Sequence, residues 1–322
     1  MDDLARAPGA TVRRAGTASA RHRAEHLATR AVGAVARALP ELAADRLGAL
    51  LGWLLARVWR PRWEVVTAQL RTAFPDADER WRLRVARRSY AHFGAEMVAW
   101  LRLGGARRAA IRERTRLIGG EILAEARERG RGVMLVSGHL GNWEVGTAGI
   151  VARGFAVDVV VARQRNPLFD SYLTGTRERL GMRVVLREDA RAGVADALET
   201  GRFVGIMGDQ DARSAGVFVD FFGRPASTAR GPALLALRSG ALLATFHTVR
   251  RPGRRPRYDV HIAPVRPGAA SEGGGRRERV AALTQAIAGA LEEAVRTHPE
   301  QYLWHHRRWK TKPRAGQPAP SD

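Results

Sequence analysis

The chain has 322 residues, a formal charge of +22 at pH 7 and 45% hydrophobic residues. This length and apolar content allow a sizeable packed core and exclude an intrinsically disordered protein, and the lack of cysteine excludes a disulfide framework or a thiolate metal site. The charge predicts attraction to an anionic partner: nucleic acid, a phospholipid surface or a phosphorylated substrate.

The first 24 residues lack the apolar core of a secretory signal peptide, so we expect a flexible basic arm. Residues 25–105 have helical periodicity and no convincing strand, which predicts an N-terminal helical region. Within it, Pro75 and Asp76 should end one helix, and Asp78 is a plausible N-cap for the next.

An apolar stripe marks one of these helices. Trp53, Trp59 and several arginines lie among its members, a composition typical of a helix that lies in a membrane surface. The same stripe could instead pack on the protein's own core. The run is far shorter than the roughly 20 residues that span a bilayer, so we expect peripheral or monotopic attachment. The stripe recurs at helical spacing and comprises Leu47, Leu50, Leu51, Leu54, Leu55 and Val58.

After Gly104 and Gly105 the pattern alternates between strands and helices. This predicts an α/β fold with a mostly parallel central sheet flanked by helices, with its site at the carboxyl ends of the strands. We expect the catalytic domain to span 106–313, followed by a disordered tail at 314–322. The expected strands are "VMLVS", "VDVVV", "RVVL", "FVGIM", "VFVDFF", "ALLATFHTV" and "RYDVHIA".

The segment "SGHLGNWE" follows the first of these strands directly. With His139 in the turn and Glu144 in the first turn of a helix, the carboxylate could orient the imidazole ring, and Asn142 or Gly141 could cap that helix. A His held in this way acts as a general base on a hydroxyl group.

Other interpretations of the segment remain open. A zinc site fits less well, because no second His lies nearby. Ser137 could act as a nucleophile, but no Gly-x-Ser-x-Gly motif surrounds it. His139 could also be incidental to a capped turn.

"SGHLGNWE" resembles the His-x4-Glu motif of the lipid A biosynthesis acyltransferases, the late lauroyl and myristoyl transferases within the lysophospholipid acyltransferase group. Three further stretches resemble the family in the same order: "QLRTAFPDADERWR", "GDQDARSAGVFVDFFGRPASTARGPALLALRSGA" and "PEQYLWHHRRWKTKP". Together the four run from about residue 65 to 313. Where the family usually has Asn, this chain has Gln69, and its N-terminal apolar run is shorter than in many members.

The resemblance implies transfer of a fatty acyl chain from acyl carrier protein or coenzyme A to a hydroxyl of a membrane glycolipid. A lipid A precursor is the first choice of acceptor and a phosphatidylinositol mannoside, or another lysophospholipid, the second. The thioester arrives activated, so no metal or organic cofactor is expected. The expected location is the cytoplasmic face of the inner membrane.

Several residues are candidates for substrate binding. Asn142 lies beside His139, and Asp209 and Asp211 follow a strand, where they could orient arginines or substrate, or cap a turn. Arg224 and Arg230 precede a helix that Pro232 can open, which favours a phosphate pocket, although both could be solvated loop residues.

Two further groups rest on the resemblance. An Arg at the end of "VDVVVAR" should face the site, and Arg163 could then stabilise the oxyanion, as could backbone N–H groups. His306, Arg307 and Arg308 in "WHHRRWK" should bind anionic head groups or the acidic donor. A second catalytic His at 306 and a plain basic surface are the alternatives.

Two rival functions remain. A nucleic-acid-binding protein would explain the charge, but the basic residues are scattered and no helix-turn-helix, zinc-finger or RNA-recognition signature occurs. A thioester or ester hydrolase could use the same residues to activate water.

Overall fold

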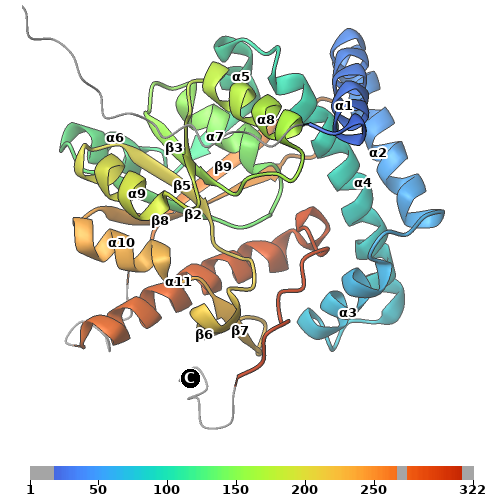
Figure 1. The fold of residues 1–322 in the computed structure, drawn as a ribbon. Helices are drawn as coiled ribbons and strands as arrows, with labels where there is room; N and C mark the ends of the chain where they lie inside the picture. The colour runs from blue at the N-terminus through green and yellow to red at the C-terminus, as the bar shows by residue number, and fades with distance from the viewer. Residues whose placement is uncertain (1–17, 267–273, 314–322) are drawn as a thin grey trace, which may run out of the picture.

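The computed structural model describes residues 18–266 and 274–313, in which a helical region lies beside a mixed α/β sheet domain (Figure 1). Most of the arm expected at residues 1–24, and the tail expected at 314–322, lie outside the described residues. The first helix begins at Ala20, earlier than residue 25, because the Ser19 side chain caps it by accepting a hydrogen bond from the backbone N–H of His22.

The N-terminal region is helical, as expected. Asp78 caps α4 by accepting from the N–H of Trp81 at 2.7 Å, and Pro75 lies in the break before it. The helices are α1 (Ala20–Ala38), α2 (Glu41–Arg57), α3 (Trp63–Ala73) and α4 (Glu79–Leu103), followed by α5 (Arg108–Arg114).

Small residues pack α2 against α4. Ala44, Gly48, Gly52 and Ala56 are buried at helical spacing, and a Cβ at Gly52 would lie 2.1 Å from the Tyr90 carbonyl oxygen. Because this face turns inward, the apolar stripe turns outward: Leu50 is 51% exposed, and every other member is at least 36% exposed. The stripe therefore does not pack on the protein's own core. In the described part of the chain, no helix combines the length and hydropathy of a membrane span.

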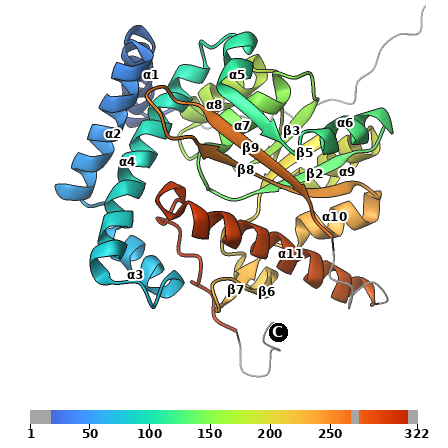
Figure 2. The same ribbon diagram turned by 180° about the vertical axis from the view of Figure 1, so that it is seen from behind.

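The central sheet has seven strands in the order β1-β9-β8-β2-β5-β3-β4, and all neighbours are parallel except β8 and β9. The mostly parallel sheet is confirmed. The strands β6 and β7 form a separate antiparallel ribbon below it (Figure 2). The sequence pattern did not reveal β1 or β7. The strands are β1 (Thr115–Ile118), β2 (Val133–Ser137), β3 (Val157–Val161), β4 (Arg183–Leu186), β5 (Phe203–Met207), β6 (Val217–Asp220), β7 (Pro225–Thr228), β8 (Leu242–Arg250) and β9 (Tyr258–Pro264).

Helices cover both faces of the sheet (Figures 1 and 2). Alternation along β2 fills both cores, since Leu135 packs in the cluster with α7 and Met134 in the cluster with α9, α10 and α11. These helices are α6 (Glu121–Glu128), α7 (Trp143–Val151), α8 (Pro167–Arg179), α9 (Ala190–Glu199), α10 (Gly231–Ser239) and α11 (Arg276–Thr297).

Candidate active site

The turn between β2 and α7 carries His139 at the carboxyl edge of the sheet. Gly141 adopts a left-handed φ of 62°, and a Cβ there would lie 1.6 Å from the Thr248 carbonyl oxygen, so only glycine fits. The N–H of Gly141 donates to the Gln301 carbonyl, and the N–H of Leu303 donates to the His139 carbonyl, each at 2.9 Å. The turn is thus fixed by segments far away in the chain.

Asp209, not Glu144, holds the His139 ring. One Asp209 carboxylate oxygen lies 2.7 Å from Nδ1 of His139, and the other accepts the His139 backbone N–H at 2.7 Å. The carboxylate is buried, which raises its pKa, but the His139 ring and N–H outweigh burial and hold the pKa well below the usual range. With Nδ1 engaged, Nε2 is the nitrogen that can meet a substrate.

Strand order explains this pairing. β2 and β5 are parallel neighbours with Ser137 opposite Met207, so the residues that follow them meet at one edge. The expectation that Glu144 orients His139 was therefore wrong, although His139 lies in the turn and Glu144 in the first turn of α7 as anticipated.

Glu144 instead forms an ion pair with Arg177 of α8. The Nε of Arg177 lies 3.2 Å from each Glu144 carboxylate oxygen, and a second guanidinium nitrogen also bonds the carboxylate. Both side chains are only 14% exposed. The pair is bidentate, which fixes its geometry as well as its charge.

A cavity of about 520 Å³ opens beside these residues, within the range of small-molecule and cofactor sites. Its polar lining includes His139, Glu144 and Arg177, and the first turn of α7 borders it. Its apolar lining comprises Phe93, Met97, Trp100, Val160, Phe169, Leu173 and Ile206.

The sequence model of the bacterial lipid A biosynthesis acyltransferases matches residues 18–311. The chain belongs to this family. It is 30% identical to the lipid A biosynthesis lauroyltransferase of Escherichia coli K12 over 285 residues, covering 85% of this chain and 88% of that protein. The palmitoleoyltransferase of the same organism is 26% identical over 273 residues, 83% of this chain and 85% of the relative.

A phosphatidylinositol mannoside acyltransferase of Mycobacterium tuberculosis H37Rv is also 30% identical, over 203 residues that cover 62% of this chain and 60% of the relative. The resemblance seen in the sequence motifs is thereby confirmed, and the two kinds of relative both transfer an acyl group.

Not all candidate residues of this acyltransferase reach the cavity. Arg163 is exposed and pairs with Glu188, with Nε 2.6 Å from a carboxylate oxygen, so it does not face the site as expected. Among the described residues, Arg177 and Arg187 are the arginines that line the cavity. Arg224 and Arg230 are exposed and lie outside its lining, although Pro232 opens α10 as expected and Arg230 is its N-cap.

The candidates near the C-terminus also differ in their exposure and contacts. Arg308 is 2% exposed and donates to the Ser227 carbonyl and the Thr228 hydroxyl, so it cannot bind a surface head group as expected, whereas Arg307 is exposed. Asp211 lines the cavity and accepts hydrogen bonds from the N–H and hydroxyl of Thr311.

His306 lies beside His139, with ring centroids 4.6 Å apart. Burial, and then the neighbouring His139, lower the pKa of His306 to about 4, so its ring is neutral at neutral pH. Asn142 is 4% exposed and caps α7 by accepting from the Val145 N–H at 3.0 Å, while its amide donates to Glu96.

Sequence reasoning missed Arg177, Arg187 and Glu96. Glu96 had a readable signal, because a carboxylate at helical spacing between Phe93 and Trp100 stands on an otherwise apolar face. Arg177 and Arg187 had no such signal, because the chain contains many arginines and nothing in the sequence distinguishes these two.

Proposed function

We propose that the protein is an O-acyltransferase of the His-x4-Glu type, which moves a fatty acyl chain from an acyl thioester to a hydroxyl of a membrane glycolipid. The observation that carries this proposal is the buried His139–Asp209 pair beside a cavity lined by both polar and apolar side chains. A lipid A precursor is the favoured acceptor, since the lauroyltransferase relative aligns over most of both chains.

In the proposed reaction, Nε2 of His139 removes the proton of the acceptor hydroxyl while Asp209 fixes the ring and stabilises the imidazolium. The acceptor oxygen attacks the thioester carbonyl and forms a tetrahedral oxyanion. The carbon–sulfur bond then breaks, and the thiolate takes the proton back from His139. The products are an ester and a free thiol, so the reaction balances without a cofactor. General-base assistance of this kind contributes about 10² to 10⁴ in rate.

The N-terminal turn of α7 is our candidate for oxyanion stabilisation in place of Arg163. Its residues border the cavity next to His139, and the positive end of a helix favours developing negative charge.

We assign the Glu144–Arg177 pair to acceptor binding. Both residues line the cavity, and an Arg beside a carboxylate can bind a sugar hydroxyl or a phosphate. Trp100, Phe169 and Leu173, which are apolar lining residues of the cavity, are the candidates for contact with the acyl chain.

We also propose peripheral attachment to the cytoplasmic face of the inner membrane through the outward apolar stripe of α2. Trp59 is 79% exposed beside Arg57 and Arg60, a composition suited to an anionic bilayer surface. Gly48 packs against Gly94 of α4, and the neighbouring Phe93 and Met97 are partly exposed and also line the cavity. The acceptor lipid could then enter from the membrane.

An assay with each thioester would identify the acyl donor, which is either acyl-loaded acyl carrier protein or acyl coenzyme A. The purified protein would be incubated with each thioester and with a phosphorylated lipid A precursor or a phosphatidylinositol mannoside, and the products analysed by mass spectrometry. We expect acylated lipid A precursor and an equal amount of free thiol, and loss of both with His139→Ala. Acylation of the mannoside alone would favour the second acceptor, while free fatty acid alone would indicate a hydrolase and overturn the proposal.

A further inference from the structure

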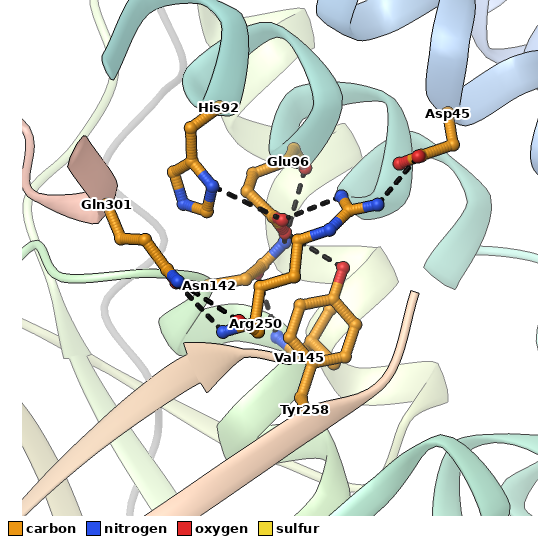
Figure 3. Close-up of polar contacts among 8 residues, drawn as sticks. All are labelled: Asp45, His92, Glu96, Asn142, Val145, Arg250, Tyr258 and Gln301. Carbon is orange, nitrogen blue, oxygen red and sulfur yellow. Dashed lines mark hydrogen bonds and ion pairs between the residues drawn. The ribbon is translucent and has the colours of Figure 1, made fainter. Parts of the chain in front are cut away.

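Glu96 of α4 lies between the helical region and the His139 turn, and it is 6% exposed (Figure 3). A buried carboxylate is costly unless its oxygens are paired and hydrogen-bonded. Glu96 borders the cavity, but its oxygens are taken up by the protein itself.

Three donors from three different segments converge on this carboxylate. One oxygen accepts the Asn142 amide at 2.7 Å and the Tyr258 hydroxyl at 2.9 Å, and the other accepts the Arg250 guanidinium at 3.1 Å. His92 stands 3.9 Å from the second oxygen. The carboxylate is therefore fixed from several directions, as Figure 3 shows.

The link to the catalytic turn runs through Asn142. Its amide oxygen caps α7, and its amide nitrogen donates to both the side chain and the backbone carbonyl of Glu96. With both ends of the amide bonded, its orientation is set. Asn142 ends the turn that carries His139, so Glu96 acts on the turn at the end opposite to Asp209.

Arg250 extends the network in two directions. Its guanidinium bridges Glu96 and Asp45 of α2, with 2.6 Å to the Asp45 carboxylate. Its backbone N–H and carbonyl both bond the Gln301 side chain, and the Gln301 carbonyl accepts the Gly141 N–H. Arg250 thus offsets the charge of Glu96 and also supports the turn from another side.

We propose that Glu96 is a positioning residue of the transfer reaction, which holds the His139–Asn142 turn in its productive geometry through the Asn142 amide. The inference rests on the proposed function. A buried ion pair contributes little net stability compared with apolar packing, so fixing one geometry is the role that its contacts support. Misplacement of a base by about 1 Å can cost on the order of 100-fold in rate.

An exchange of acid and amide between the two positions tests the contact. Glu96→Gln places an NH₂ group either against the Asn142 amide and the Tyr258 hydroxyl or against Arg250, so at least one donor loses its acceptor. Asn142→Asp keeps the cap oxygen but sets two carboxylates face to face. In the double variant the amide now at position 96 can donate to the carboxylate now at position 142 and accept from Arg250, which restores the side-chain contact in reverse but not the bond to the backbone carbonyl of residue 96.

We expect each single variant to lower kcat by roughly 10- to 100-fold, with the KM of both substrates changed by less than about 3-fold, and the double variant to recover part of kcat relative to either single variant. Activity would be expressed per folded protein, with kcat taken at the plateau of each pH profile. If Glu96→Gln does not fold, Asn142→Ser keeps an N-cap oxygen but removes the amide group that donates to Glu96, and it should show the same loss of kcat.

Asp158→Asn is the matched control, because Asp158 is also a buried carboxylate with arginine partners, Arg183 and Arg202, but it lies in β3 away from the cavity. It should lower the unfolding temperature and leave kcat unchanged. The positioning role would be overturned by an unchanged kcat in folded Glu96→Gln or Asn142→Ser. A rise in KM with no fall in kcat would overturn it as well. Absence of acyl transfer by the wild-type protein would instead refute the proposed function.

Discussion

Both oxygens of Asp209 bind His139, one at the ring Nδ1 and one at the backbone N–H, each at 2.7 Å, although the residues are 70 positions apart. The carboxylate thereby fixes the tautomer, the orientation of the ring and the start of the turn together. A ring free to rotate would present Nε2 to the cavity for only part of the time.

Asp209→Asn should therefore damage the chemical step. An amide has one acceptor oxygen, so it cannot accept from both His139 groups, and it can stabilise the wrong tautomer. We expect kcat to fall by about 10² to 10⁴ with little change in KM. Steady-state kinetics on protein shown to be folded by circular dichroism would measure this, and a kcat close to wild type would rule out the assignment of Asp209.

Glu144→Gln should behave differently, because Glu144 contacts Arg177 and not the His139 ring. We expect the KM for the glycolipid to rise by about 10-fold and kcat to change less. Arg177→Met should do the same, whereas Arg163→Met should change neither constant, since Arg163 pairs with Glu188 outside the cavity. A loss confined to kcat would return Glu144 to the role of His139 partner.

The elements of the fold could largely be predicted, but the partners in the site could not. Alternating and continuous apolar runs mark strands such as Val133–Ser137 directly, and Asp78 and Asn142 mark helix starts by their capping chemistry. Strand order is set by packing between distant segments. The sequence therefore marked both His139 and Asp209 without showing that β5 lies next to β2.

Nearness in sequence also misled the pairing of Glu144. Five positions separate it from His139 in the sequence, but the start of α7 directs its side chain to α8, where Arg177 lies in a stretch without any motif. For the apolar stripe, the sequence identified the correct set of residues but not the direction in which they point. Its spacing predicted one face of α2, but only the buried Gly48 and Gly52 on the opposite face decide that the stripe points outward.

Gly52→Ala should destabilise the contact between α2 and α4. The new methyl group would meet the Tyr90 backbone carbonyl, which cannot move as a side chain can. We expect a loss of about 1–3 kcal/mol in the free energy of unfolding, measured by urea titration. Gly289→Ala in α11 is the control, because nothing lies within 4 Å of its Cβ position, and it should gain about 0.5–1 kcal/mol from helix propensity. Equal effects of the two variants would contradict the close approach of the helices.

Replacement of Leu50, Leu51 and Leu54 with Ser should release the protein from anionic vesicles. These side chains are exposed, so their loss removes membrane contact and little of the core. Raised salt should weaken attachment as well, since each basic residue near an anionic surface contributes about 1 kcal/mol. Vesicle flotation would measure binding, with Ile118→Ser as a control for loss of an exposed apolar side chain elsewhere. A folded wild-type protein that ignores such vesicles would refute the attachment.

Mild acid should destabilise the fold through three partly buried histidines. The pKa values of His247, His305 and His306 are each lowered from 6.5 to about 4, mainly because burial disfavours the charged ring. Between these two pH values the unfolded chain binds protons that the folded chain does not, so the free energy of unfolding falls as the pH falls. The stability is fully present above about pH 6.5, and each such group removes up to about 1.4 kcal/mol per pH unit below it.

His247→Gln isolates one of these contributions. His247 stacks on His261 at 4.9 Å between ring centroids, and His298 is a further positive group that acts on it when charged. Urea unfolding at pH 7.5, 6 and 5 would give the slope of the unfolding free energy against pH. This slope should be smaller in the variant by up to the contribution of one proton, about 1.4 kcal/mol per pH unit, because Gln does not titrate. An unchanged pH slope in His247→Gln would mean that the stacked ring accepts a proton in the folded state as readily as in the unfolded chain.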